Sequence, residues 1–367
     1  MCVLAVAAGY GAHSLVRGAG SSVAADPPGA HTGGGGSAPR TQAPPPPTKV
    51  DGRVLRIAAV GDTMLGSTPT LPPSPGTYFA AVRAELRGDI VFGNLEGTLT
   101  DAAAGKCAPK AQNCFAFRAP PEYAHDLRLA GFTVMNNANN HSYDFGPDGQ
   151  AQTVRALHAA GIAQTGLPGE ITVVHAAGLR VAMLGFAPYS DTASLLDVPL
   201  ARTLIERADA LADIVVVAIH AGAEGTGAMH MTGGEESYVG EDRGDPEAFA
   251  HMAIDAGADL VLGSGPHVLR GMELYHRRLV AYSMGNFAGY HNFALDGVLA
   301  DSAILHVRLS AHGAFLSGRV SSVRLEDAGM PVLDPAGAGA QLIAELSRDD
   351  LGPGAVAITA GGRIAAS

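Results

Sequence analysis

The segment 213–219 reads DIVVVAI, an aspartate followed by six apolar residues. A strand with one face in water alternates apolar and polar residues, whereas a strand buried on both faces is apolar along its whole length. We therefore predict that this segment is a central strand of a sheet that is covered on both faces. The next residue, His220, then lies at the carboxyl end of that strand.

Strands and helices alternate along the chain from residue 51 onward. Apolar runs that predict strands are separated by segments with the apolar spacing of helices. This alternation, with β-rich additions, predicts an α/β fold in which two sheets are covered by helices on both outer faces. The predicted strands are 53–60, 89–92, 131–135, 171–175, 179–186, 213–219, 258–262, 272–275, 279–282, 303–309 and 314–325, and the predicted helices are 78–87, 121–130, 147–160, 199–211, 246–256 and 340–346.

The charge and composition limit the partners. The 367 residues carry a formal net charge of -11 and no block of basic residues. Nucleic-acid-binding proteins gather Lys and Arg on one face, so the composition argues against nucleic acid as a partner and gives no polybasic membrane signal. Aromatic residues make up only 5% of the chain and Trp is absent, so Ala, Val and Leu must build the core.

The first fifty residues differ in composition from the rest. Residues 1–12 are apolar and small, and the segment 1–25 is typical of a signal or anchor segment with a truncated start. Residues 26–50 contain runs of four Gly and four Pro, which is typical of an extended linker. We expect residues 51–330 to form the main domain and 331–367 a C-terminal helix and tail. We expect the protein to be exported and held at the cell surface or membrane by its N-terminus.

Polar side chains directly follow five of the predicted strands. In an open α/β sheet, ligands collect at the carboxyl ends of the strands. The stretch 136–146, which reads NNANNHSYDFG, is the densest of these polar segments, and packing gives no reason for its Asn residues. The central hypothesis is that these strand ends form one metal centre acting on a phosphate-like or acyl group. The residues concerned are Asp62, Glu96, Asn140 with His141, His220 and His267.

Each of these residues also has a simpler structural explanation. Asp62 fits a helix N-cap about as well as a metal ligand. Glu96 fits a solvated carboxylate, His220 a hydrogen-bonded core histidine, and His267 a turn residue. The Asn-rich stretch fits an Asx turn with a surface histidine. Chance explains two such strand ends, but five are much harder to explain that way.

The residue types indicate the chemistry. Carboxylate, amide oxygen and imidazole without thiolate suit Mn, Fe, Zn or Mg at a catalytic site, with one or two divalent ions. Two ions can stabilise the oxygens of an in-line displacement at phosphorus. His141 is then placed to protonate a leaving oxygen, and Asp144 to orient His141 and fix its tautomer.

A series of short motifs resembles one known family. In chain order they are G-D, N-L-E, N-N-H-x-x-D, H-x-G-x-E, G-x-x-P-H-V and S-x-G-N-F, and they cover roughly residues 57–287. The series is similar to the CapA family of poly-γ-glutamate capsule biosynthesis proteins, within the calcineurin-like metallophosphatase superfamily. The resemblance implies a four-layer αββα sandwich with the metal site at the strand ends.

The resemblance also implies roles and partners. It implies that His141 is catalytic and that metal is held by five residues, which are Asp62, Glu96, Asn140, His220 and His267. It implies an anionic polymer or a phosphoester as substrate, and membrane-bound capsule synthesis subunits as partners. The positions expected to contact substrate are Asn94, Arg118, Glu224 and Asn286.

One departure from the family pattern affects the metal site. The family usually has another histidine shortly before the final one, whereas this chain reads GSGPH at 263–267. Neither Ser264 nor Gly265 replaces an imidazole well. Three consequences are then open. One metal ion binds weakly, water or a nearby side chain takes the place of the histidine, or full dinuclear activity is lost. The nearby side chains considered are Asp242, His230 and His291.

Cys107 and Cys114 lie close together in a polar segment. Their spacing does not match a zinc knuckle. In an exported protein they would form a loop-closing disulfide, and in the cytosol they would be two idle thiols.

Two functions of different classes follow from these patterns. The first is an exported metal-dependent hydrolase that acts on phosphoesters or on a surface polymer during capsule or envelope assembly. The second is a non-catalytic subunit that binds an anionic polymer or guides its export. The second needs positive charge, from metal or from the local arginines, which are Arg118, Arg270, Arg277 and Arg278.

Overall fold

Two sheets form the centre of the computed structural model, which describes residues 51–108 and 114–365. The predicted signal or anchor segment (1–25) and linker (26–50) lie outside the described residues. The smaller sheet has six strands in the order β13-β14-β12-β9-β8-β7. Its central strand β9 (Ile214–His220) is buried along its whole length and pairs in parallel with β8 and β12, as the apolar run predicts. The other five strands are β7 (Thr172–Ala176), β8 (Leu179–Phe186), β12 (Leu260–Ser264), β13 (Met272–Tyr275) and β14 (Arg278–Ala281).

The larger sheet has ten strands. Eight of them follow the order β19-β20-β17-β16-β1-β2-β5-β6, with β15 paired to β1 and β18 paired to β17. Strand β1 pairs in parallel with β2 and β15 and antiparallel with β16, so the sheet is mixed. The strands are β1 (Val54–Met64), β2 (Ile90–Leu95), β5 (Val134–Asn136), β6 (Ala163–Thr165), β15 (Asn286–Gly289), β16 (Asp301–Ser310), β17 (Phe315–Glu326), β18 (Met330–Leu333), β19 (Ala357–Ile358) and β20 (Arg363–Ala365).

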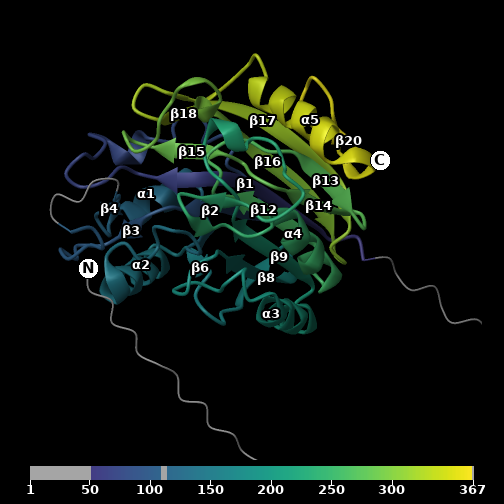
Figure 1. Ribbon diagram of the computed structural model, residues 1–367, viewed down its shortest axis with the longest axis horizontal. Helices are drawn as coiled ribbons and strands as arrows, with labels where there is room; N and C mark the ends of the chain where they lie inside the picture. Colours follow the sequence, from purple (N-terminus) through teal and green to yellow (C-terminus); the bar gives the residue numbers. More distant parts are fainter. Residues whose placement is uncertain (1–50, 109–113, 366–367) are drawn as a thin grey trace, which may run out of the picture. The chain divides into compact units, whose positions relative to one another are not determined.

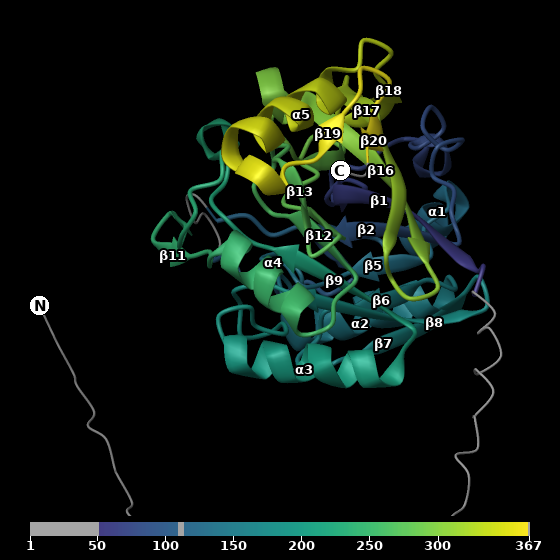
Figure 2. The same cartoon turned by 90° about the vertical axis from the view of Figure 1, so that its right-hand side faces the viewer.

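The two sheets face each other across one apolar core. That core combines side chains from both sheets, and a helix, α5, contributes Ala340 and Ile343 to it. A second apolar cluster joins the outer face of the smaller sheet to α3 and α4, and a third joins the outer face of the larger sheet to α1 and α2. The strands therefore lie between two helical flanks, which is the predicted four-layer αββα arrangement (Figures 1 and 2). The helices are α1 (Tyr123–Ala130), α2 (Gly146–Ala159), α3 (Val198–Leu211), α4 (Pro246–Asp255) and α5 (Ala338–Asp350).

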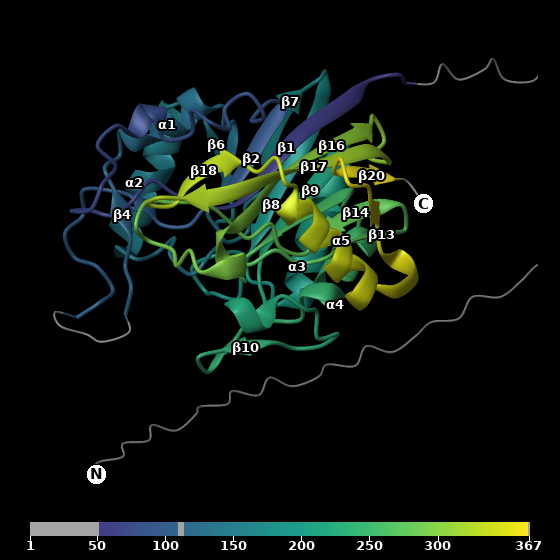
Figure 3. The ribbon, with the colours of Figure 1, turned by 90° about the horizontal axis from the view of Figure 1, so that it is seen from above.

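Short elements complete the fold. Strands β3 (Thr98–Leu99) and β4 (Arg118–Ala119) pair with each other, and β10 (Ser237–Tyr238) with β11 (Glu241–Asp242) forms a small hairpin (Figure 3). The segment 331–367, expected as a helix and tail, also adds β19 and β20 to the larger sheet. In the part of the chain that the structure describes, no helix has the length and apolar character that a membrane crossing requires. The 3₁₀ helices are Pro75–Thr77, Thr226–Ala228, Gly297–Ala300 and Gly352–Gly354.

The predicted helix at 78–87 is wrong. After the 3₁₀ helix Pro75–Thr77, the backbone continues as consecutive turns, with three-residue hydrogen bonds such as Val82 N–H to the Phe79 carbonyl at 3.1 Å. The apolar side chains that gave the helical spacing are nevertheless buried against the larger sheet, among them Phe79, Val82 and Leu86. Burial of that apolar stripe does not require the four-residue hydrogen bonds of an α-helix.

Candidate metal centre

Asp62, Glu96 and His267 converge on one buried point. One ligand atom from each lies within 4.8 Å of the others, and the described residues contain no other such group of three His, Cys, Asp or Glu side chains. The His267 ring places Nδ1 3.2 Å from Asp62 Oδ2 and Nε2 3.5 Å from Glu96 Oε1. Three side chains from distant parts of the sequence therefore meet where the sequence predicted a metal site.

Strand pairing brings these residues together. Asp62 lies in register with Asn94 of β2 and with Asn286 of β15. His220 ends β9 and lies in register with Ser264, which ends β12. Because these neighbouring strands run parallel, their carboxyl ends share one edge of each sheet. One detail of the prediction is wrong, because Asp62 and His220 lie within their strands rather than after them.

His220 joins this group from the smaller sheet. Its Nδ1 lies 3.8 Å from Asp62 Oδ1 and its Nε2 lies 3.9 Å from Glu96 Oε1. Burial lowers the pKa of His220 well below the ordinary value, although the Asp62 carboxylate acts in the opposite direction. The ring is therefore neutral, which is the form that binds metal ions.

Glu96 is the side chain that most requires a cation. It is fully buried, and neither of its carboxylate oxygens has a hydrogen-bond partner among the described residues. Burial raises the pKa of Glu96 well above its usual range, although the charge of His267 acts in the opposite direction. Burying a carboxylate that accepts no hydrogen bond is costly, and a bound cation would offset that cost. His220 Nε2 and Asn140 Oδ1 are likewise buried without a partner, so the donor set fits a divalent ion.

The ring of His267 is held by Asn286. The Asn286 Oδ1 atom lies 2.9 Å from His267 Nδ1, and His267 adopts a positive φ of 60°. Burial lowers the pKa of His267, but the carboxylates of Glu96 and Asp62 outweigh burial and raise the pKa to about 10. For Asp62, burial raises the pKa, but the hydrogen bond and charge of His267 outweigh it, so the pKa is lowered.

Asn94, expected to contact substrate, is instead surrounded by protein groups. Its Nδ2 donates to Asp62 Oδ1 over 2.8 Å and lies 3.3 Å from His220 Nδ1. Its Oδ1 accepts hydrogen bonds from Asn136 at 2.8 Å and from Asn139 at 3.1 Å. These roles of Asn136 and Asn139 were not predicted, although the density of Asn in 136–140 indicated that the segment has a function.

Two neighbours hold the pair formed by His141 and Asp144. His141 Nδ1 lies 2.9 Å from Asp144 Oδ2, and the backbone N–H of Phe117 donates to that same oxygen over 2.6 Å. Lys106 Nζ lies 2.6 Å from Asp144 Oδ1. The Phe117 ring packs against the His141 ring, with 4.6 Å between their centroids. Lys106 and Phe117 were not predicted, and nothing in their sequence context marks them.

Asn140 lies beside this pair. Its backbone carbonyl accepts a hydrogen bond from Lys106 Nζ at 3.0 Å. Its Oδ1 atom is buried and has no partner among the described residues. That free acceptor is compatible with the predicted ligand role.

Ser264 and Gly265 occupy the position where the family pattern has histidine. Ser264 Oγ lies 3.2 Å from His220 Nδ1, and the Gly265 N–H points to Asp62 Oδ2 at 3.4 Å. The three side chains considered as replacements lie elsewhere. His230 Nδ1 lies 2.8 Å from Asp350 Oδ1, Asp242 accepts a hydrogen bond from the Gly244 N–H, and the His291 N–H donates to the Ala328 carbonyl. None of them belongs to the buried group of Asp62.

Glu224 lies at the edge of the centre. Its Oε2 atom is 3.8 Å from His267 Nε2, and its Oε1 atom is 2.8 Å from Arg243 Nη1. Arg243 is buried and also donates to the Tyr189 hydroxyl over 2.7 Å. Neither Arg243 nor Tyr189 was singled out from the sequence, because each lies in a segment without a metal or phosphate motif.

Two of the arginines proposed to attract a polymer are engaged inside the protein. Arg270 is fully buried and pairs with Glu236 at 2.7 Å. Arg118 donates to the Ala102 carbonyl and lies over the Phe145 ring, with 5.1 Å from Cζ to the centroid. The buried pair with Glu236 leaves Arg270 unavailable as a surface charge, whereas Arg118 is half-buried and lines a pocket together with Glu96.

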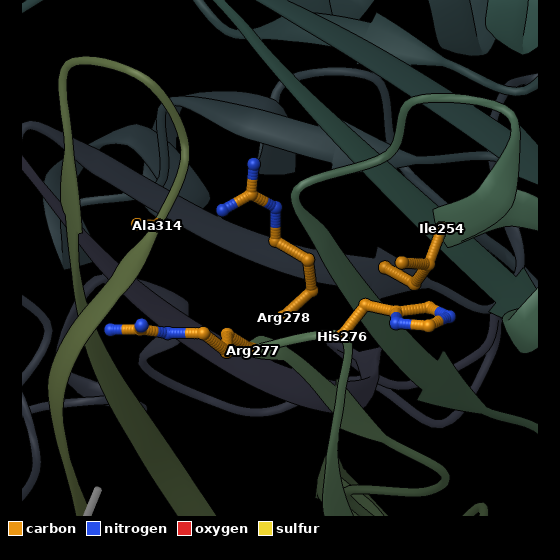
Figure 4. Close-up of a pocket in the computed structure, with 5 residues that line it drawn as sticks. All are labelled: Ile254, His276, Arg277, Arg278 and Ala314. Carbon is orange, nitrogen blue, oxygen red and sulfur yellow. The ribbon is translucent and has the colours of Figure 1, made fainter.

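Arg277 and Arg278 lie at the opposite end of the smaller sheet. Arg277 lies in the turn between β13 and β14 and Arg278 begins β14, and both line a surface pocket with Ile254, His276 and Ala314 (Figure 4). Strand β14 begins at Arg278 and runs parallel to β12, whose far end carries Ser264. The pocket is therefore separated from the metal centre by the length of the strands.

Cys107 and Cys114 are joined in a disulfide with 5.7 Å between their Cα atoms. The bond closes a short loop between Lys106 and Phe117, the two residues that contact Asp144. The loop therefore begins and ends at groups that hold the His141 and Asp144 pair.

Comparison with known proteins identifies the family of this chain. The family model described as bacterial capsule synthesis protein PGA_cap matches residues 56–290. The chain belongs to the PGA_cap family. The matched range contains every residue placed in the metal centre, including Asp62 and Asn286.

Two of the curated relatives of this PGA_cap chain are CapA proteins. The capsule biosynthesis protein CapA of Bacillus anthracis is 30% identical over 286 residues, covering 71% of this chain and 65% of that protein. The PGA biosynthesis protein CapA of Bacillus subtilis is 29% identical, covering 71% and 69%. An uncharacterized protein of Sinorhizobium fredii is 29% identical, covering 65% and 66%. The chain thus spans a little less than two thirds of the length of this Sinorhizobium protein.

Solved structures give weaker similarities to this PGA_cap chain. A 5'-nucleotidase precursor from Thermus thermophilus has a TM-score of 0.41 and 13% identity, covering 81% of this chain and 59% of that one. The purple acid phosphatase PPD1 from yellow lupin has a TM-score of 0.36 and 10% identity, covering 76% and 53%. At these values the similarities do not bear on the function.

Proposed function

We propose that this PGA_cap protein is a metal-dependent hydrolase of the phosphoesterase type that serves poly-γ-glutamate or another cell-surface polymer. The observation that carries the proposal is the Glu96 carboxylate, which is fully buried without a hydrogen-bond partner. It faces Asp62, His220 and His267, which are the donor types of a catalytic metal site. A structural role alone gives no reason to bury that carboxylate.

The geometry and the free atoms support five residues as those that would hold the ion. Asp62, Glu96, His220 and His267 surround one point, and Asn140 offers its free Oδ1. When bound, a divalent ion supplies Lewis acidity and lowers the pKa of a coordinated water. Mn, Fe, Zn and Mg all fit this donor set, in one or two copies.

His141 is the proton donor in this proposal. Asp144 faces Nδ1 of the ring, so the proton on that nitrogen is fixed and Nε2 is free to exchange a proton with a substrate oxygen. The Phe117 ring restricts the tilt of the imidazole, and Lys106 and the Phe117 N–H fix the carboxylate. These contacts orient Nε2 before substrate binds.

The substrate class comes from the relatives. The CapA proteins of Bacillus anthracis and Bacillus subtilis are described as capsule and PGA biosynthesis proteins. We propose the same process for this chain, with a phosphoester or an anionic polymer as substrate and membrane-bound capsule synthesis subunits as partners. We also propose export to the cell surface, supported by the disulfide between Cys107 and Cys114.

Ser264 supports a second candidate function. The family histidine is replaced by a hydroxyl that contacts His220 rather than completing a second ion site. A protein with a weakened metal centre would bind an anionic polymer or guide its export without turnover. Arg277 and Arg278, at the far end of the smaller sheet, would then be a contact surface.

Turnover distinguishes the two functions. The purified protein is assayed on a generic phosphoester with and without added Mn²⁺, together with the variants His141→Gln and His158→Gln. His158 is an exposed residue of α2 and serves as the matched control. The hydrolase proposal expects metal-dependent turnover that His141→Gln reduces and His158→Gln does not. A folded, metal-loaded protein that turns over none of the phosphoesters would favour the binding function.

A further inference from the structure

Arg243 is a buried cation that the proposed mechanism leaves without a role. It follows β11, and only 1% of its surface is exposed. Its Nε donates to the Gly222 carbonyl over 3.0 Å, and its Nη1 donates to the Tyr189 hydroxyl and pairs with Glu224. The Tyr189 ring lies 6.0 Å from Arg243 Cζ. These contacts fix the guanidinium in one orientation.

The remaining nitrogen of Arg243 has no partner. Nη2 is buried and makes no hydrogen bond within the described residues. A Cβ atom placed on Gly265 would lie 3.2 Å from Nη2 and 3.2 Å from Cδ2 of His220, so Nη2 lies on the His220 side of the metal centre. The same Gly265 directs its N–H to Asp62 Oδ2. The free N–H bonds of a buried guanidinium therefore lie beside the group that would hold the ion.

A second metal ion has a poor environment on this side. Ser264, in the position of the family histidine, contacts His220 Nδ1 and offers no imidazole. Arg243 already brings a permanent positive charge to the same place, and two cations in a buried pocket repel each other. The Arg243 guanidinium takes up one oxygen of Glu224, which lowers the negative charge available to a second ion.

We propose that Arg243 supplies the second positive charge of this centre and binds an anionic oxygen of the substrate through Nη2, so that the centre works with one divalent ion. The inference rests on the proposed function. A planar guanidinium forms strong, directional hydrogen bonds to phosphoryl and carboxylate oxygens. Arg243 thus selects substrates that carry such an oxygen next to the reacting group.

The test measures metal content and anion binding on the full-length protein. Elemental analysis counts the ions per chain, and titration calorimetry measures binding of inorganic phosphate and, separately, of glutarate. The variants are Arg243→Gln, Arg243→Lys and the control Arg207→Gln, an exposed arginine of α3 on the outer helical flank. The probe that binds the wild type identifies the oxygen as phosphoryl or carboxylate.

We expect one ion per chain in the wild type and in every variant. Arg243→Gln should weaken anion binding about 10- to 100-fold, as expected for the loss of a charged hydrogen bond. Arg243→Lys, which keeps the charge but loses the planar fork, should weaken it less, and Arg207→Gln should leave it unchanged. Two tightly bound ions in the wild type, or equal anion affinity in Arg243→Gln, would overturn the inference.

Two controls keep the result interpretable. Because Arg243 is buried, thermal unfolding must show that Arg243→Gln is folded. If it is not, Tyr189→Phe removes the hydroxyl that accepts from Nη1 and should weaken anion binding to a smaller extent, while unchanged binding would count against the inference. A wild type that binds neither metal nor anion would refute the proposed function itself. A wild type that binds both, with Arg243→Gln indistinguishable from it, would refute only the role of Arg243.

Discussion

The Asn94 side chain donates a 2.8 Å hydrogen bond to Asp62 Oδ1 and accepts two from Asn136 and Asn139. One buried amide therefore connects the carboxylate of β1 to the Asn-rich segment after β5. In metal sites, changing a group that hydrogen-bonds to a ligand typically lowers metal affinity about 10- to 100-fold. We expect Asn94 to have this role for Asp62.

Asn94→Ala should destabilise the protein and weaken metal binding. The change removes one hydrogen bond each from Asp62, Asn136 and Asn139, although Asn136 still donates to the Ala138 carbonyl and Asn139 to the Leu95 carbonyl. We expect a loss of about 1–3 kcal/mol in the free energy of unfolding, because the buried Oδ1 atom of Asp62 loses its hydrogen bond. Chemical denaturation measures it. Asn292→Ala, at a half-buried position, is the control, and equal losses in both variants would contradict the role of Asn94.

Gly185→Ala should disturb the same network from the other sheet. A Cβ atom on Gly185 of β8 would lie 1.9 Å from Asn136 Oδ1, so Asn136 must move away from Asn94. Overpacking of this kind costs about 1–3 kcal/mol. We expect a lower unfolding midpoint together with weaker metal binding.

The control for this change is Gly234→Ala, since no atom lies within 4 Å of a Cβ placed there. Its stability and metal affinity should equal those of the wild type. If Gly185→Ala were as stable as Gly234→Ala, the close approach of the two sheets at Asn136 would not matter energetically.

Much of the fold follows from local patterns. The apolar run of β9 and the hairpin of β7 and β8 are predictable because burial on both faces and a Gly turn leave clear marks in the sequence. The turns at 78–87 are not, because the same apolar spacing serves a helix and a series of three-residue turns. No residue pattern identifies the last residue of a strand, which is why Asp62 was expected after β1 rather than within it.

The candidate site also has a part that the sequence predicts and a part that it does not. Asp62, Glu96 and His267 could be found because carboxylate and imidazole at strand ends are unusual. Arg243 and Lys106 could not be found, since each reaches the site from a loop that is distant in sequence and has no motif. Only the three-dimensional path of those loops shows what they contact.

Asp144→Asn should reduce turnover without unfolding the protein. The amide cannot hold the protonated Nδ1 of His141 as a carboxylate does, so the ring loses its fixed tautomer. We expect a fall of about 100-fold or more in kcat, the range of general acid–base contributions. Asp148→Asn, an exposed residue of α2, is the control. Equal kcat values for the two variants would exclude the His141 and Asp144 pair from the reaction.

His306 should make stability depend on pH. Burial and the charge of Arg319 lower the pKa of His306 from its ordinary value of 6.5, although Glu85 acts in the opposite direction. Because the unfolded chain binds a proton that the folded protein does not, this contribution to stability is present above pH 6.5 and is lost as the pH falls. Unfolding free energies measured on both sides of that value should therefore decrease toward acid.

In His306→Gln this decrease should be smaller than in the wild type. His175→Gln, which changes an exposed residue of β7, should retain the full decrease. An unchanged slope in His306→Gln would show that the histidine titrates alike in the folded and unfolded states.

The buried carboxylate of Glu96 should bind a metal ion. Zinc anomalous diffraction from crystals of the protein grown with Zn²⁺ would locate that ion. We expect a peak about 2.0–2.2 Å from a Glu96 oxygen and from His220 Nε2, at the distances of zinc ligands. A well-ordered Glu96 with no anomalous peak within coordinating distance, at saturating Zn²⁺, would show that this carboxylate is not a metal ligand.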